Sequence, residues 1–261
     1  MVKGLDKFRE AFAAYSANYV IIGGTACDAV LTGTDMRPRA TDDIDMILVV
    51  ENMMEEFAKA FWRFIKEGGY KNGKRKRGED KPPVYELYRF SDGKEGYPVQ
   101  IELLSRHSEL LQAPSGFHIE PLPVGEDVSS LSAIMMDDDY YELTVKDSFM
   151  DNGLRFASPK ALICLKVKAY LNLLAEKEAG RQVNTKDIKK HRNDVLKLIA
   201  VTPIGEPSAI PPTIHENILA YAEKLRSMLP DQSLEDALQR SSGEINAYLD
   251  ALMEMFTPQE K

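Results

Sequence analysis

The hydrophobic pattern divides the chain into two parts with different periods. In the first part, short apolar runs bounded by turn residues predict strands at residues 19–24, 41–50, 84–90 and 97–105. Apolar residues at helical spacing predict helices over 4–16, 25–32 and the segment that ends at Gly68-Gly69. We expect the strands at 84–90 and 97–105 to form an antiparallel pair beside the strand at 41–50. Residues 33–40 are rich in Gly, Asp and Pro and predict a loop.

After Ser158-Pro159, a typical helix start, the pattern becomes helical throughout. Four amphipathic segments follow, at residues 160–180, 185–201, 214–229 and 234–256. The sequence therefore predicts an α+β domain over residues 1–155 and a C-terminal α-helical bundle over residues 156–261. Between the two lies an acid-rich stretch, 119–152, which we interpret as a connecting region with "YYELTV" as an edge strand.

The amino-acid composition excludes some classes of protein but does not indicate a particular function. A hydrophobic fraction of 44% and a charged fraction of 28% are typical of a globular protein. A net charge of −8 argues against non-specific nucleic-acid binding by the whole surface, although it leaves room for a local basic groove. The only cysteines are Cys27 and Cys164, and no apolar run is long enough to span a membrane. We expect a cytoplasmic protein with no membrane contact.

Two acids interrupt the apolar strand at 41–50. Because alternate residues of a strand share a face, Thr41, Asp43 and Asp45 point one way, and Asp42 points the other. The α-carbons of Asp43 and Asp45 would lie roughly 6.6 Å apart. Their carboxylates can therefore bind one hard cation, with Mg²⁺ expected and Mn²⁺ as an alternative. A divalent ion would also offset the repulsion between the two acids.

The turn that precedes these acids has the features of a phosphate site. Gly23 and Gly24 let the backbone come close to a ligand, Thr25 adds a hydroxyl, and the following helix begins with free N–H groups. A further acid, Glu102, lies in the otherwise buried strand at 97–105. We expect Glu102 to complete the site as a metal ligand or general base, although an exposed edge-strand side chain is the alternative.

These residues resemble the signature of the nucleotidyltransferase superfamily related to DNA polymerase β. The string "GGTA…RATDDID" is similar to its minimal nucleotidyltransferase branch, which includes AbiEii-type abortive-infection toxins, and Arg39 and Thr41 match positions of that branch. In this chain 18 residues separate Gly24 from Asp43, more than in the compact members. The resemblance implies a polymerase-β-like mixed sheet with flanking helices and the catalytic and metal-binding acids Asp43, Asp45 and Glu102. It also implies a nucleoside triphosphate substrate such as ATP.

The resemblance extends more loosely into the helical part. Lys166, or alternatively Lys168, fits the lysine that reaches the nucleotide phosphates. Lys190, Asn193 and Asp194 fit a later motif of the branch, with His191 where an acid is usual. A second register would start at Lys186-Asp187 instead. For Lys166, Lys190 and Asp194, a solvated helix face with ion pairs is the competing interpretation.

The function implied is Mg²⁺-dependent transfer of a nucleoside monophosphate to a hydroxyl, with release of pyrophosphate. The acceptor could be an RNA end, a protein or a small molecule, and an antitoxin is a further partner to expect. The basic segment 71–81 is either a solvated hairpin tip or an arm that contacts RNA phosphates. The alternative to an enzyme is a catalytically silent nucleotide-binding or toxin–antitoxin interaction protein.

Overall fold

The fold is that of a computed structural model, which describes residues 2–52, 54–72, 85–106 and 137–259. Most of the basic segment 71–81 and the acid-rich stretch up to residue 136 lie outside the described residues. The expectations for them therefore stay predictions.

A mixed seven-stranded sheet forms the centre of the molecule, in the order β3-β4-β5-β2-β1-β7-β6. β2 is antiparallel to β1 and parallel to β5, and β5 pairs with β4 in antiparallel fashion, so the expected arrangement of these strands is confirmed. The strands are β1 (Tyr19–Ile22), β2 (Asp43–Leu48), β3 (Lys71–Asn72), β4 (Tyr85–Ser91), β5 (Gln100–Arg106), β6 (Ser148–Asp151) and β7 (Leu154–Ala157).

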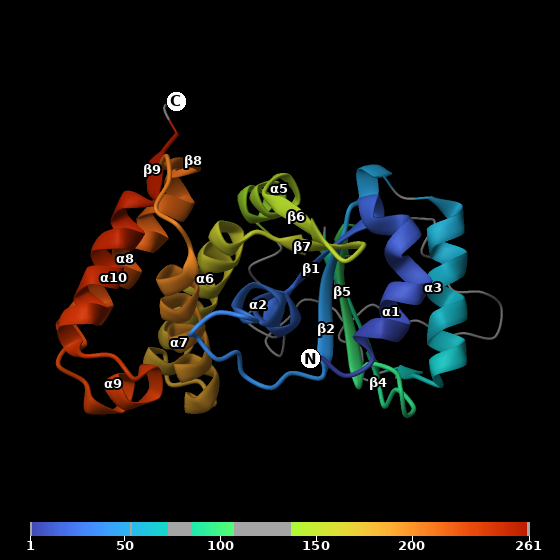
Figure 1. The fold of residues 1–261 in the computed structure, drawn as a ribbon, viewed down its shortest axis with the longest axis horizontal. Helices are drawn as coiled ribbons and strands as arrows, with labels where there is room; N and C mark the ends of the chain where they lie inside the picture. Colours follow the sequence, from blue (N-terminus) through green and yellow to red (C-terminus); the bar gives the residue numbers. More distant parts are fainter. Residues whose placement is uncertain (1, 53, 73–84, 107–136, 260–261) are drawn as a thin grey trace.

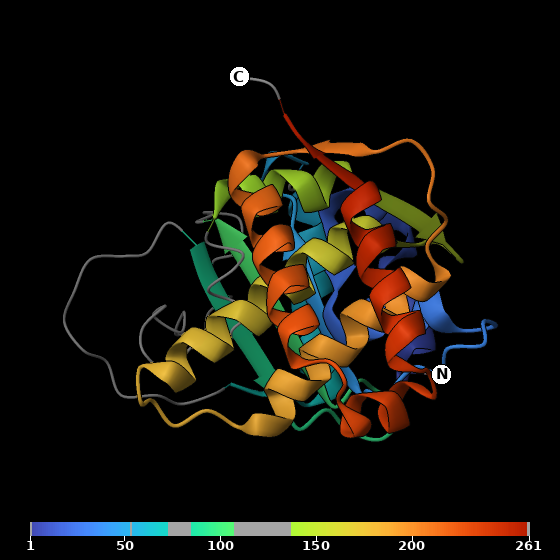
Figure 2. The same ribbon diagram turned by 90° about the vertical axis from the view of Figure 1, so that its left-hand side faces the viewer.

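Helices cover both faces of the sheet (Figure 1). α1 (Leu5–Phe12) and α3 (Glu55–Gly68) lie on one face, and α2 (Gly23–Leu31) lies on the other with α6 (Pro159–Glu178) and α7 (Thr185–Val201) behind it. α8 (Pro212–Met228) and α10 (Ser242–Glu254) pack side by side as the outermost layer (Figure 2). The remaining elements are η1 (Ala13–Asn18), η2 (Val50–Asn52), α5 (Asp138–Lys146), β8 (Ser208–Ile210), α9 (Gln232–Leu238) and β9 (Phe256–Pro258).

Burial on both faces explains the continuous apolar character of the central strands. All residues of β1 are 0% exposed, and Ile44, Met46 and Leu48 of β2 are 0% exposed as well. On the side of α1 and α3, aromatic rings such as Phe12 and Phe61 pack 6.1 Å apart between their centroids. One hydrophobic cluster extends from this side through the sheet into α6, α7 and α8.

Two local predictions are wrong. "YYELTV" is not an edge strand but part of α5, because the Asp137 carboxylate caps that helix by accepting from the Asp139 N–H. Tyr140, Tyr141 and Thr144 then share its buried face. The predicted helix at 234–256 is two helices, α9 and α10, since Gln239 is left-handed and Ser241 caps α10 anew.

The transition from sheet to helices occurs where the sequence pattern changes. β7 ends at Ala157, and the Ser158 hydroxyl caps α6 by accepting from the Ala161 N–H, with Pro159 in the first turn. The α+β class is confirmed. None of the helices within the described ranges is long and apolar enough to cross a membrane.

Candidate functional site

The strand register places the acids together. Asp43 pairs with Gln100 and Asp45 with Glu102 between the parallel strands β2 and β5, so the side chains of each pair lie next to one another on the same face. Ile22, the last residue of β1, pairs with Asp45 from the other side. The glycine turn thus begins beside the acids. Asp42 is exposed and does not line the site, as strand parity predicts.

These groups line one pocket of about 390 Å³. Its volume lies in the range of small-molecule sites. The pocket lies between the end of the sheet and the helices α6 and α7. It is lined by Gly23, Gly24, Arg39, Thr41, Asp43, Asp45, Gln100, Glu102, Lys166, Leu173, Glu176, Gln182, Val183, Asn184, Asp187, Lys190 and His191.

Both positions must be glycine, because neighbouring side chains lie too close to leave room for a β-carbon. Gly23 has a φ of +68°, and a β-carbon there would lie 2.0 Å from Asp45 Oδ2. A β-carbon at Gly24 would lie 2.5 Å from Arg39 Nη2 and 2.8 Å from Thr41 Oγ1. The turn therefore presses directly against an acid on one side and against Arg39 and Thr41 on the other.

Thr25 does not lie where the sequence predicts it. Its side chain is 1% exposed and does not line the pocket. Its hydroxyl instead donates to the backbone carbonyl of Asp43. Thr25 therefore joins α2 to β2 and sets the position of β2 relative to the glycine turn.

The acids repel one another inside a poorly solvated site. Burial and the Glu102 carboxylate raise the pKa of Asp45 to about 7. The pKa of Asp43 is also raised, by burial and by Asp42. Neither Asp43 nor Asp45 has an ion-pair partner within the described ranges. The repulsion is therefore compensated only in part by the cations across the pocket.

Glu102 differs from the other two acids because it is held by neighbours. Its Oε1 accepts from Arg89 Nε at 2.7 Å and from Gln100 Nε2 at 2.8 Å. No described residue donates to Oε2. Arg89 and Gln100, which the sequence analysis did not single out, thus orient the carboxylate and leave one oxygen open. The strand register reveals Arg89, which pairs with Glu102 across β4 and β5, whereas Gln100 shares a face with Glu102 because it lies two residues earlier on the same strand.

A buried ion-pair network forms the base of the opposite wall. Asp194 Oδ2 accepts from Lys166 Nζ at 2.8 Å and from Arg39 Nε at 3.5 Å. Burial alone would lower the pKa of Lys166, but the charge and hydrogen bond of Asp194, together with Cys27, outweigh burial, and the pKa is raised. Of the two candidate lysines, Lys166 lines the pocket and Lys168 does not. Asp194 lies behind the lining, so it orients Lys166 and Arg39 rather than facing the pocket.

The face of α7 adds two further groups to the pocket lining. Burial, Arg39 and Lys166 lower the pKa of Lys190, which lines the pocket. His191 is 6% exposed, and burial beside Lys166 and Lys190 lowers its pKa to about 2. Its imidazole is therefore neutral at any physiological pH. Asp187 of the second possible motif register also lines the pocket, so residues of both registers contribute.

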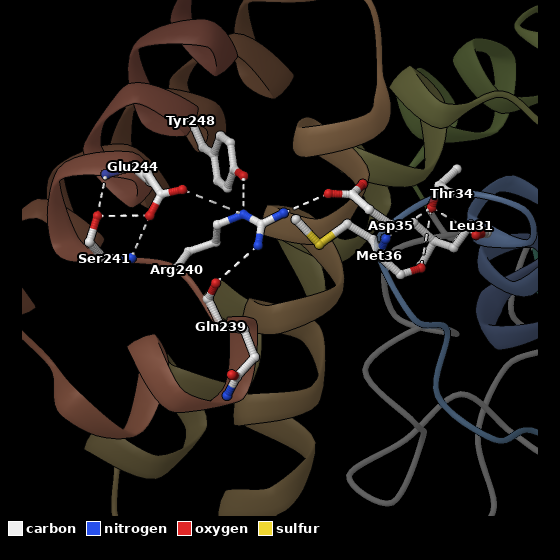
Figure 3. A network of polar contacts seen from close by, with 9 residues as sticks. All are labelled: Leu31, Thr34, Asp35, Met36, Gln239, Arg240, Ser241, Glu244 and Tyr248. Carbon is white, nitrogen blue, oxygen red and sulfur yellow. Dashed lines mark hydrogen bonds and ion pairs between the residues drawn. The ribbon is translucent and has the colours of Figure 1, made fainter.

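The C-terminal helices hold the loop that carries Arg39 and Thr41. Arg240, which follows α9, donates to Asp35 at 2.6 Å and to the Tyr248 hydroxyl at 3.0 Å (Figure 3). Lys197 of α7 donates to the backbone carbonyl of Arg37 at 2.9 Å. Met36, between these contacts, is 3% exposed. The predicted loop is therefore anchored on both sides before it reaches the pocket.

The residues fit a metal ion that a substrate helps to bind. In the part of the chain that the structure describes, no cluster of three or more His, Cys, Asp or Glu side chains forms a metal cage. Mg²⁺ is usually held by one or two carboxylates together with substrate phosphates and water. Asp43 and Asp45 both line the pocket and supply such a pair, and burial together with the Glu102 carboxylate raises the pKa of Asp45 to about 7.

Comparison with known proteins adds little. No family model matches the chain, and no curated protein matches it. Among solved structures, JHP933 from Helicobacter pylori is similar with 14% sequence identity and a TM-score of 0.41, over 96% of this chain and 92% of that chain. A similarity at that level carries no argument about function, which rests on the site alone.

Proposed function

We propose that the protein is a Mg²⁺-dependent nucleotidyltransferase with the mixed-sheet arrangement of the polymerase-β-related superfamily. One observation carries the proposal. Asp43, Asp45 and Glu102, on two adjacent parallel strands, face the same pocket as the Gly23-Gly24 turn.

Cationic side chains would bind the triphosphate. Arg39 lies against Gly24, and Lys166 and Lys190 line the same wall, so the phosphates would meet both the glycine turn and the positive charges. Mg²⁺ held by Asp43 and Asp45, with Glu102 beside them, would neutralise charge that develops on the phosphoryl oxygens. Asp194 would keep Lys166 and Arg39 in place for this task.

The reaction would be an in-line substitution at the α-phosphorus. An acceptor hydroxyl oxygen bonds to the α-phosphorus, the bond from that phosphorus to the oxygen bridging to the β-phosphate breaks, and pyrophosphate leaves with the electron pair. The open oxygen of Glu102, held by Arg89 and Gln100, would take the hydroxyl proton. Most of the rate acceleration would come from positioning and charge neutralisation.

The acceptor classes to test are an RNA end, a protein hydroxyl and a small molecule. The resemblance to AbiEii-type toxins favours a macromolecular acceptor and an antitoxin partner. The direct experiment incubates the protein with α-labelled nucleoside triphosphates, Mg²⁺ and pooled cellular RNA and protein. We expect label in one pool with the wild type and none with Asp45→Asn.

Asp42→Asn is the matched control, because Asp42 is an exposed neighbour that does not line the pocket. It should label like the wild type. Equal labelling by wild type and Asp45→Asn would refute the proposal. Metal-dependent binding of the triphosphate without labelling of any pool would favour the silent nucleotide-binding alternative.

A further inference from the structure

The sign of the charge reverses locally around α7. The whole chain has 41 acidic and 33 basic residues, whereas residues 181–197 contain two Asp and six Lys or Arg. These six cations are Arg181, Lys186, Lys189, Lys190, Arg192 and Lys197. A cationic segment in an acidic protein is either a solvated helix face or a contact surface for a polyanion. The place of the side chains in the fold distinguishes the two.

Four of the lysines lie on one side of α7. Lys186, Lys189, Lys190 and Lys197 are spaced i, i+3, i+4 and i+11, and we call them the lysine face. Lys186 and Lys189 are exposed and have no ion-pair partner among the residues that the structure describes. Asp187 lies about 100° further round the helix and lines the pocket, where it interacts with Lys190. It therefore flanks the lysine face without interrupting it.

The lysine face is continuous with the cationic side of the pocket. Lys190 belongs to both, because it also lines the pocket. Further along α7, the contact of Lys197 with the carbonyl of Arg37 holds the backbone of the loop against the helix, two residues before Arg39 reaches the pocket. From Lys186 to Lys197 the face is about 16 Å long. A polyanion longer than one nucleotide can therefore contact the face and the pocket at the same time.

The chemistry of the face fits a phosphate backbone better than a protein surface. Protein interfaces are centred on apolar and aromatic anchors and are depleted in Lys. No side chain of α7 is among the exposed large hydrophobic residues in the described part of the chain. Lysines are typical contacts to phosphates, which position a nucleic acid without reading its sequence. With a net charge of −8, the protein offers such a strand few other attractive surfaces.

We infer that the lysine face binds the phosphate backbone of an RNA strand and directs the end of that strand to the pocket, so that RNA is the acceptor. The acceptor role rests on the proposed function. In that reaction the oxygen of the terminal RNA hydroxyl would bond to the α-phosphorus as pyrophosphate leaves, and the proton would pass to Glu102. Single-stranded DNA has the same backbone charge, so the test includes it.

The test measures binding of a short 5′-labelled single-stranded RNA by fluorescence anisotropy at a series of salt concentrations. Lys186→Gln/Lys189→Gln should reduce the slope of log affinity against log salt by about 1.4, because each phosphate contact to a single strand contributes about 0.7. Affinity at low salt should fall severalfold. Since both lysines are exposed, thermal unfolding of the variant should match the wild type.

Arg63→Gln/Lys66→Gln is the matched control. Arg63 and Lys66 are also exposed and three residues apart, but they lie on α3, across the sheet from α7 (Figure 1). The control removes the same charge and should keep the wild-type slope. An unchanged slope in the α7 variant, or the same loss of slope in both variants, would overturn the inference. Binding of polyglutamate but not of RNA would assign the face to an acidic protein and overturn it as well.

A transfer assay tests the acceptor role with α-labelled nucleoside triphosphates, Mg²⁺ and the same RNA, or DNA of the same sequence. We expect labelled RNA with the wild type, and a severalfold higher KM for RNA with Lys186→Gln/Lys189→Gln. DNA should bind with a similar salt slope, because lysines contact the phosphates, and labelling of DNA alone would overturn RNA as the acceptor.

The two assays separate failure of this inference from failure of the proposed function. If a protein or a small molecule is labelled and RNA is not bound, the proposed function holds and the inference is wrong. If RNA binds through the lysines but no pool is labelled, the binding face is supported and the proposed transfer is refuted.

Discussion

Asp45 is the residue at which stability and the proposed chemistry oppose each other most clearly. It lies between the glycine turn and Glu102, and burial with that neighbouring carboxylate raises its pKa to about 7. Lys166 and Lys190 face it across the pocket and lower the pKa in part, while Asp43 raises it. Its charged form destabilises the fold, whereas the proposed function needs that charge to bind a metal ion.

Substitution of Asp45 by Asn should therefore stabilise the metal-free protein. Asp45 has a pKa near 3.8 in the unfolded chain. Below that pH its carboxyl group is protonated in both the folded and the unfolded state, so it does not affect the free energy of unfolding. As the pH rises through 3.8 toward 7, the unfolded state ionises first, and the folded state loses relative stability. Thermal unfolding should show a gain of about 0.5–2 kcal/mol for Asp45→Asn at pH 8, and a smaller gain at pH 5. A loss of stability at pH 8 would contradict the picture of an uncompensated charge.

Metal binding should depend on the same group. Because a carboxylate ligand must be ionised, Mn²⁺ or Mg²⁺ affinity should rise between pH 6 and pH 8 in the wild type. Titration calorimetry at the two pH values measures this. In Asp45→Asn we expect weak binding that does not change over the interval, and an affinity equal at both pH values in the wild type would count against Asp45 as a ligand.

The Lys166–Asp194 pair should be structurally essential. Both side chains are nearly fully buried, at 2% and 5% exposed, and removal of one leaves the other charged and unpaired. Asp194→Ala should lower the free energy of unfolding by about 3–5 kcal/mol. The comparison is Glu55→Ala, in the exposed ion pair with Lys59, and denaturant unfolding should find its stability close to that of the wild type. Equal, small effects of both variants would contradict the burial of this network.

The local sequence pattern is enough to predict which of the acids share one face of the sheet. Strand parity placed Asp43 and Asp45 together and excluded Asp42, and the same reasoning applied to Glu102 on its strand. It missed residues whose role depends on tertiary neighbours. Arg89 orients Glu102 through the register between β4 and β5, which no single segment encodes, whereas Gln100 lies two residues from Glu102 and strand parity could have identified it. It also assigned Thr25 to the ligand, whereas the hydroxyl is used for the Asp43 carbonyl.

At the level of elements, the glycine turn is a sharp structural constraint on the pocket. Gly23→Ala should both strain a left-handed residue and push a β-carbon into Asp45. Gly33, in the loop, has a φ of +85°, and a β-carbon added there would have no neighbouring atom within 4 Å, so Gly33→Ala measures the backbone cost alone. Denaturant unfolding should show about 1–2 kcal/mol of destabilisation at Gly33 and more at Gly23.

Metal affinity distinguishes the two glycine variants further. Only Gly23→Ala should weaken Mn²⁺ binding, because only Gly23 lies against the carboxylate. Similar metal affinities in both variants would show that the contact between the turn and Asp45 is not needed for the site.

Helices and strands can be predicted from the sequence where their apolar residues follow a single spacing, either helical or alternating. α3 is an example, since its amphipathic pattern and its end at Gly68-Gly69 match the structure. The segment "YYELTV" was predicted wrongly because β-branched and aromatic residues favour a strand, while the decisive signal, the Asp137 cap, lies before it. A competing local cap thus outweighed intrinsic strand preference.

For the whole molecule, the C-terminal helices contribute to the site without lining it. Arg240 reaches Asp35 at 2.6 Å and joins the loop before Arg39 to α10 (Figure 3). Arg240→Ala should loosen the loop and weaken tripolyphosphate binding by about two- to tenfold. Arg226→Ala, which removes a similar exposed pair with Asp250 between α8 and α10, is the control and should bind as the wild type. Faster hydrogen exchange in residues 33–40 of Arg240→Ala alone would identify the loop as the cause.

If Arg240→Ala and Arg226→Ala bind tripolyphosphate equally well, the loop does not depend on the C-terminal helices. This contact could not be predicted from sequence, because Asp35 and Arg240 are 205 residues apart and neither belongs to a motif. The α+β class could be predicted, since it follows from local periods alone. How the helices α6 and α7 close one wall of the pocket required the tertiary structure.

The central claim is that this pocket transfers a nucleoside monophosphate under the control of Asp45. The most direct measurement follows ATP or another preferred triphosphate labelled either at the α- or at the γ-phosphate, with Mg²⁺ and the acceptor pool. The account predicts that the wild type attaches the α-label to the acceptor and releases the γ-label as pyrophosphate, and that Asp45→Asn does neither. Attachment of the γ-label, or equal attachment of the α-label by Asp45→Asn, would contradict it.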